Sequence, residues 1–161
     1  MAAGSLLARF GDGLFQQAFV VADLDTAQRA CAETLGCETF VTLPPASLPY
    51  RYRGDDVECA LAIAFARSGN VQIELIQPVS GRGLHEEFLT ARGPGAHHLG
   101  FLVDDLDRAL ATAAAAGHAE AMSGQFGALR FAYVDTFEAL GVYLELVEDP
   151  DGMMYQLMPW K

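Results

Sequence analysis

The sequence repeats itself, and this repeat constrains the fold more than any other feature. Residues 16–25 (QQAFVVADLD) correspond to residues 98–107 (HLGFLVDDLD), with five of the ten positions identical. A second pair of segments, residues 71–76 (VQIELI) and 142–147 (VYLELV), closes each half. Because 161 residues fit one ordinary domain, we expect two copies of one unit that fold toward each other.

The first half has the pattern of a strand, a helix and three further strands. Alternating side chains predict a strand over residues 14–22, and Asp23 and Gly36 are typical of the start and stop of a helix between them. Proline lacks the amide donor of a strand ladder, so the proline-rich residues 43–49 are expected to form a loop. The remaining strands are predicted over residues 37–43, 57–66 and 70–77.

The second half repeats this order. It is predicted to contain a strand at residues 97–103, a helix at 105–116 and strands at 118–122, 129–135 and 141–148, and residues 153–158 are expected to add a last strand. We therefore predict an α+β fold of two tandem βαβββ modules whose curved mixed sheets form a metal-binding cup. The expected divisions are an N-terminal arm (1–12), the first module (13–78), a connector (79–95) and the second module with its tail (96–161). The connector is expected to contain a short helix that carries His85 on its surface.

Composition excludes several classes of protein. Asp and Glu outnumber Lys and Arg by 21 to 10, and the formal net charge of -11 argues against nucleic-acid and anionic membrane surfaces. No apolar run approaches the roughly 20 residues that span a bilayer, and the first residues lack the basic start of a secretion signal. Three cysteines without CxxC spacing fit a reducing compartment. A cytoplasmic protein is expected.

Four potential metal ligands lie at matching points of the repeat: Gln16 corresponds to His98, and Glu74 corresponds to Glu145. If the halves are related by a pseudo-twofold axis, these side chains converge on it. Carboxylates in such apolar strands lose several kcal/mol of hydration unless they are compensated. One divalent cation would compensate both carboxylates, and the donor set is compatible with Zn, Ni, Co, Mn or Fe.

Two points remain open at this level. The turn at residues 149–152 offers a second register that would place Gln156 in the ligand set; Glu145 is preferred because it aligns with Glu74. Arg51 and Arg53 are predicted to bind an anionic group of the substrate. The alternative is a solvated loop whose arginines offset an acidic surface.

The chain resembles the vicinal oxygen chelate superfamily, which includes glyoxalase I, methylmalonyl-CoA epimerase, extradiol dioxygenases and bleomycin-resistance proteins. The resemblance covers residues 14–148 and is strongest in residues 19–25, 71–78 and 93–101. It implies paired βαβββ modules with a metal in the cup. Gln16, Glu74, His98 and Glu145 match the ligand pattern of the animal-type glyoxalase I, whereas the glycine-rich approach to His98 is closer to the epimerase-like branch.

The resemblance implies a divalent-metal-dependent isomerase, epimerase or lyase that stabilises an enolate of a small molecule with adjacent oxygens. Glu145 or Glu74 would take and return the proton. One alternative is a non-catalytic binding protein of the bleomycin-resistance kind. An extradiol-type dioxygenase is less favoured, because Gln16 replaces its first histidine. A homodimer is expected, since sheet edges need covering.

Overall fold

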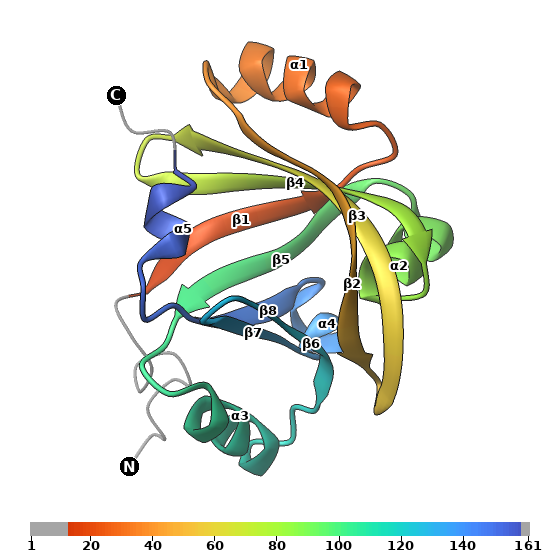
Figure 1. The fold of residues 1–161 in the computed structure, drawn as a ribbon, viewed down its shortest axis with the longest axis vertical. Helices are drawn as coiled ribbons and strands as arrows, with labels where there is room; N and C mark the ends of the chain where they lie inside the picture. The colour runs from red at the N-terminus through yellow and green to blue at the C-terminus, as the bar shows by residue number, and fades with distance from the viewer. Residues whose placement is uncertain (1–12, 159–161) are drawn as a thin grey trace.

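Two βαβββ units follow one another along the chain (Figure 1). The computed structural model describes residues 13–158, so the expected arm over residues 1–12 lies outside the described residues. The first unit comprises β1 (Leu14–Val20), α1 (Leu24–Leu35), β2 (Val41–Tyr52), β3 (Asp55–Ser68) and β4 (Val71–Gly81). The second comprises β5 (Gly95–Leu102), α3 (Leu106–Ala115), β6 (Glu120–Phe126), β7 (Leu129–Val134) and β8 (Tyr143–Glu148). Three helices lie outside this order: α2 (Leu84–Arg92), α4 (Phe137–Leu140) and α5 (Met153–Gln156).

The helices α1 and α3 begin in the same way, as the repeat predicts. The carboxylate of Asp23 accepts a hydrogen bond from the amide of Thr26 at 2.8 Å, and that of Asp105 accepts one from the amide of Arg108 at 2.9 Å. Each aspartate satisfies an amide that has no partner within its helix. Gly36 ends α1 in the left-handed region, with φ of 69°, where a side chain would be strained.

The eight strands close into one barrel-like cup in the order β1-β4-β3-β2-β6-β7-β8-β5. β1 is parallel to β4, β5 is parallel to β8, and β1 pairs antiparallel with β5 to join the two units. The other neighbours, including β2 and β6, are antiparallel. The predicted α+β fold with mixed, curved sheets is confirmed, and the cup forms within one chain.

The helices of the repeat cover the outside of the cup (Figure 1). α1 packs its buried Cys31 in one apolar cluster with Ile73 and Leu75 of β4, and α3 packs Leu106 with Leu146 of β8. Because successive side chains of a strand point to opposite faces, the residues between these outward positions point inward. The interior therefore receives Glu74 on β4, and Glu145 and Val147 on β8.

The predicted loop at residues 43–49 is wrong, because β2 runs through it. The pairing of β2 with β3 shifts between Leu43 and Ala46, so Pro44 and Pro45 lie at an irregularity. On its other side, β2 pairs with β6 only from Tyr50 onward. Up to that point the strand is an edge, where a missing amide donor costs no ladder hydrogen bond.

The C-terminal strand predicted over residues 153–158 is also wrong. Asp149 accepts hydrogen bonds from the amides of Met153 and Met154, both at 2.8 Å, and so starts the short helix α5. β4 continues to Gly81, past the expected end of the first module at residue 78. Among residues 13–158, no helix has both the length and the apolar character needed to cross a membrane.

Candidate metal centre and active site

Four adjacent strands bring the predicted ligands together. β4, β1, β5 and β8 are neighbours in the barrel and carry Glu74, Gln16, His98 and Glu145 in that order. In the strand register, Gln16 lies beside Gly100, which lies beside Glu145. One step along the strands, Glu74 lies beside Ala18, which lies beside His98. The four donors thus occupy two neighbouring rows on the inner face.

The four side chains meet at Nε2 of His98. This nitrogen lies 3.1 Å from Oε1 of Gln16, 3.2 Å from Oε2 of Glu74 and 3.3 Å from Oε2 of Glu145. Gln16 and His98 are fully buried, and the two glutamates are 6% exposed. The ligand atoms of Glu74, His98 and Glu145 all lie within 4.8 Å of one another, so this cluster could hold a metal ion.

Small residues between the donors make this convergence possible. Ala18 and Gly100 occupy equivalent positions of the repeat, and each lies between two donors of its row. A Cβ atom on Gly100 would meet Oε1 of Gln16 at 2.7 Å and its Cβ at 2.9 Å. Such distances are closer than atoms normally pack, so glycine leaves the space into which Gln16 extends.

Buried polar neighbours orient two of the donors. Nε2 of Gln16 donates to Oε1 of Gln72 at 2.7 Å, and Nε2 of Gln72 donates to the carbonyl oxygen of Met154 at 3.2 Å. These two hydrogen bonds turn Oε1 of Gln16 toward the cluster. Nδ1 of His98 lies 2.9 Å from Nδ1 of His97, which leaves Nε2 of His98 for the cluster. Hydrogen bonds of this kind fix ligand orientation in metal sites.

Burial and charge act against each other on the ionisable groups of the cluster. Burial alone lowers the pKa of His98, but the negative charges and hydrogen bonds of Glu145 and Glu74 outweigh this and raise it to about 9. For Glu74, burial raises the pKa of the carboxyl group against the lowering effect of His98. Without a metal ion, the raised pKa of His98 favours a buried imidazolium that lies beside the carboxyl groups of Glu74 and Glu145.

A proton on Nε2 of His98 cannot provide a hydrogen bond to every oxygen atom of this cluster. A single Nε2–H group can point at only one of the three surrounding oxygens. Oε2 of Glu74 lies 3.2 Å from this nitrogen but has no partner with hydrogen-bond geometry among residues 13–158. An unpaired buried carboxylate oxygen is costly. One amide oxygen, one imidazole nitrogen and two carboxylate oxygens around a common point fit a divalent cation.

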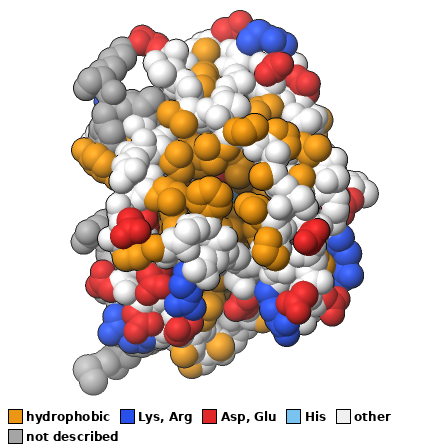
Figure 2. Space-filling view, viewed as in Figure 1, with side chains coloured by type: hydrophobic (Ala, Val, Ile, Leu, Met, Phe, Trp, Pro, Cys, Tyr) orange, Lys and Arg blue, Asp and Glu red, His pale blue; other side chains and the backbone are white. Residues whose placement is uncertain are grey.

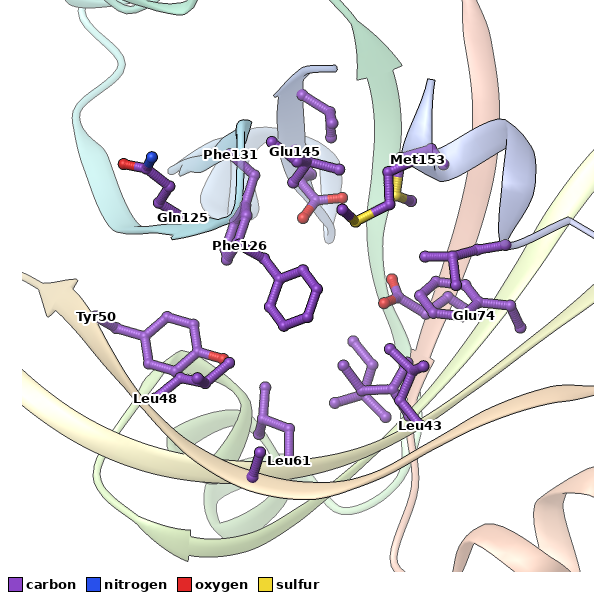
Figure 3. A pocket seen from close by; sticks show the side chains of 18 of the residues that line it. Leu43, Leu48, Tyr50, Leu61, Glu74, Gln125, Phe126, Phe131, Glu145 and Met153 are labelled. Carbon is purple, nitrogen blue, oxygen red and sulfur yellow. The ribbon is translucent and has the colours of Figure 1, made fainter. Parts of the chain in front are cut away.

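A pocket of about 320 Å³ opens onto the two glutamates. Figure 3 shows the carboxylates of Glu74 and Glu145 pointing into this pocket, with Tyr50 on its opposite side. Figure 2 shows hydrophobic side chains gathered around a hollow at the centre of this face, with charged groups mainly toward its margins. The lining is predominantly aliphatic and aromatic, as in Leu48, Leu61, Ile63, Phe126, Phe131 and Met153.

Two lining residues that the sequence did not indicate are His85 and Tyr133. The predicted surface position of His85 is wrong, since this side chain is 1% exposed and its Nε2 lies 3.2 Å from the hydroxyl of Tyr133. Burial lowers the pKa of His85 to about 3. Burial, with the charges of Glu145 and Glu74, raises the pKa of Tyr133 well above its ordinary value. Both side chains are neutral at pH 7, and the protonated hydroxyl of Tyr133 lies within hydrogen-bond distance of His85.

The structure does not bring the other candidates into this pocket. Arg51 is paired with Asp56 at 3.0 Å, and Arg53 with Glu87 at 2.8 Å; neither arginine belongs to the lining. Gln156 lies on α5, is exposed, and donates to the carbonyl oxygen of Asp151. Glu145, and not Gln156, therefore occupies the cluster.

The closed pair of βαβββ units, with donors from equivalent strands, defines a glyoxalase-like fold. A family model described as the Glyoxalase/Bleomycin resistance protein/Dioxygenase superfamily matches residues 15–133. The chain belongs to this superfamily, as the repeat and its motifs predicted.

Solved structures with the same fold cover nearly the whole chain. Methylmalonyl-CoA epimerase from Mycobacterium tuberculosis is 26% identical, with a TM-score of 0.60, over 96% of this chain and 97% of that one. A Streptomyces coelicolor methylmalonyl-CoA epimerase variant in complex with 2-nitronate-propionyl-CoA is 20% identical, with a TM-score of 0.56, over 88% and 99%. A hypothetical protein from Bacillus halodurans C-125 is 20% identical, with a TM-score of 0.62, over 86% and 95%. No curated protein matches the chain.

Proposed function

We propose that the protein is a divalent-metal-dependent isomerase or epimerase that moves a proton at a carbon next to a substrate carbonyl. The observation that carries this proposal is the convergence of Gln16, Glu74 and Glu145 on Nε2 of His98 at the wall of an apolar pocket. The structural similarity to methylmalonyl-CoA epimerases supports proton-transfer chemistry of this type.

In this proposal, Gln16, Glu74, His98 and Glu145 hold the ion. When bound, a divalent cation supplies Lewis-acid stabilisation of the negative charge that develops on a substrate oxygen. Gln16 and His98 are fully buried and do not line the pocket, so their part is to hold the ion in place. Zn, Ni, Co, Mn and Fe all suit such a mixed oxygen and nitrogen donor set.

Glu74 and Glu145 carry the second part of the proposed chemistry. Both carboxylates line the pocket, and either one can face a substrate C–H bond. A base that takes and returns a proton works best when its pKa lies near the working pH. Burial shifts the pKa of Glu74 upward, in that direction. The protonated hydroxyl of Tyr133, beside His85, is placed to donate a hydrogen bond to a bound oxygen.

The first test is metal content and proton exchange in the purified protein. We expect about one divalent ion per chain, and metal-dependent incorporation of deuterium from D2O at the α-carbon of at least one of two carbonyl probes, α-hydroxyacetophenone or methylmalonyl-CoA. His98→Ala should lose the metal. Glu145→Gln should lose exchange by at least about 100-fold, the usual scale for a general base.

Matched controls separate the site from general damage to the fold. His118→Ala and Glu33→Gln make the same chemical changes outside the pocket lining, and both should keep metal and exchange activity. Full metal retention by His98→Ala would remove this histidine from the site. Equal exchange rates with and without metal would refute the proposed role of the ion.

The apolar lining also favours a second candidate, a non-catalytic binding protein of the bleomycin-resistance type. Tight binding of an aromatic ligand by metal-free protein, with no deuterium exchange under any metal, would support this candidate over the enzyme. An extradiol-type dioxygenase is less favoured because Gln16 stands where a histidine is needed. A homodimer and a cytoplasmic location remain predictions from the sequence.

A further inference from the structure

Among residues 13–158, neither lysine nor arginine lines the pocket beside the glutamates. Of the residues that line it, the ionisable ones are Glu74, Glu145, His85, Tyr50 and Tyr133. His85 is 1% exposed and its Nε2 lies 3.2 Å from the hydroxyl of Tyr133, so it faces a neutral phenol rather than an anion. The acidic groups of the described lining are therefore the two glutamates.

Four arginines on the strands of the cup and in the turns beside them are engaged by carboxylates outside the pocket lining. Arg51 pairs with Asp56, and Arg82 with Asp55. Arg53 and Arg130 each lie within ion-pair distance of two acidic groups: Glu87 and Asp135 for Arg53, and Asp107 and Glu148 for Arg130. An arginine recruited to a substrate would first have to leave its ion pair.

The charge of the loaded site follows from its ligands. A divalent cation with a neutral His98 is balanced by the two negative charges of Glu74 and Glu145. A substrate carboxylate or phosphate would then add an uncompensated negative charge to an apolar chamber, which costs affinity because the charge loses its hydration. A neutral substrate carries no such penalty.

The shape and surface of the pocket point to an apolar group on the substrate. Its volume of about 320 Å³ lies at the small end of ligand pockets, which span roughly 300–1,000 Å³. The rings of Tyr50, Phe131 and Tyr133 form a contiguous aromatic wall, with centroids 6.1 Å and 5.9 Å apart along it. Such a wall favours contact with another ring.

We propose that the site takes an uncharged, apolar substrate with two neighbouring oxygens, of the aryl α-hydroxy ketone class, and that it rejects carboxylates and acyl-CoA thioesters. The part of this proposal that concerns the oxygens rests on the proposed metal-dependent function. The selectivity rests independently on the lining. It distinguishes this chain from the epimerases of similar fold, since methylmalonyl-CoA carries a carboxylate and several phosphate charges.

Binding of three probes to the zinc-loaded protein tests the selectivity. The probes are α-hydroxyacetophenone, the same compound with a 4-carboxylate, and methylmalonyl-CoA, each measured by isothermal titration calorimetry. We expect the neutral compound to bind at least about tenfold more tightly than either anion, the scale of one uncompensated, partly screened charge. Equal or tighter binding of an anion, or no binding of the neutral compound, would overturn the proposal.

A charge added to the lining provides the converse test. Leu48→Lys places a cation in the wall and should narrow the preference for the neutral compound over its 4-carboxylate. Val79→Lys adds the same charge at a position that is 50% exposed and outside the lining, and it should leave the preference unchanged. If circular dichroism shows that Leu48→Lys is unfolded, Ala46→Lys at an exposed lining position replaces it. An unchanged preference in the folded lining variant would contradict the argument.

The outcome separates this inference from the proposed function. Preference for the neutral compound in protein that binds no metal would support the substrate class and refute the metal-dependent chemistry. Metal-dependent deuterium exchange with methylmalonyl-CoA, together with tight binding of that thioester, would support the chemistry and refute the substrate class.

Discussion

Metal binding is expected to become tighter as the pH rises, because the ion must replace a proton on His98. In the metal-free protein, the pKa of this imidazole is raised to about 9 by Glu145 and Glu74, in spite of its burial. Removing the proton at pH 7 costs about 2.7 kcal/mol, since each pH unit below the pKa corresponds to about 1.36 kcal/mol. At pH 9 about half of His98 is deprotonated, so apparent metal affinity should increase about 50-fold between pH 7 and pH 9.

The stability of the metal-free protein should change in the opposite direction. A histidine whose pKa is higher in the folded than in the unfolded state stabilises the fold fully below the unfolded value, here 6.5, and this contribution is lost as the pH rises to about 9. The raised pKa of Glu74 acts in the same sense, because the folded state holds that proton more tightly. The increase in melting temperature caused by metal should thus grow from pH 6.5 to pH 9.

Two measurements test this expectation. Competition of cobalt(II) with a chelator of known pH dependence gives the affinity at each pH, and calorimetry in buffers of different ionisation enthalpy gives the number of protons released. We expect about one proton per ion near pH 7. His98→Gln keeps an oxygen atom that can ligate the metal but has no titrating ring. This variant should bind the metal more weakly, and its metal affinity should lose most of its dependence on pH. A flat affinity between pH 7 and pH 9, or binding without proton release, would refute the reasoning.

Two further predictions concern the surroundings of the cluster. Gly100→Ala should displace Gln16 and lower metal affinity, with a packing cost of about 1–3 kcal/mol; Gly95→Ala on the same strand meets only an ordinary contact at 3.9 Å and serves as the control in metal titrations. Metal-free protein should also lose stability as the pH falls from 6.5 toward 3, because burial depresses the pKa of His85 to about 3 and lowers that of His97 well below 6.5. Urea unfolding should show that His85→Phe loses less stability than the native protein over this range, and an identical loss would contradict the assignment.

The convergence of the four donors could be predicted from the sequence because it follows from two periodicities. The repeat pairs Gln16 with His98 and Glu74 with Glu145, and the alternation of strand side chains places them inside. The same register contained a further signal: Ala18 and Gly100, two residues after Gln16 and His98, are both small. Their smallness makes room for donors from the neighbouring strands.

Other parts of the site could not be predicted, because they depend on contacts outside the repeat. His85 belongs to the connector, and only the docking of α2 against the barrel brings it beside Tyr133 of β7. The run of β2 through Pro44 and Pro45 depends on that strand having a free edge, which sequence does not reveal. The ion pairs of Arg51 and Arg53 with acidic residues could not be predicted from the local sequence pattern either.

The departures from internal symmetry determine how the site behaves. Gln72 and Tyr143 occupy equivalent positions of the repeat and lie beside Gln16 and His98, respectively. Gln72 accepts a hydrogen bond from the proposed metal ligand beside it, Gln16, through its side-chain amide, whereas Tyr143 has no amide with which to do the same for His98. His98 is instead oriented by His97, its neighbour in sequence. The first half thus supplies a neutral donor that needs no proton removed, whereas the second half supplies the imidazole that must lose one. A symmetric cluster with a histidine at residue 16 would release more protons on binding an ion, so the steepness of the pH dependence reports this asymmetry directly.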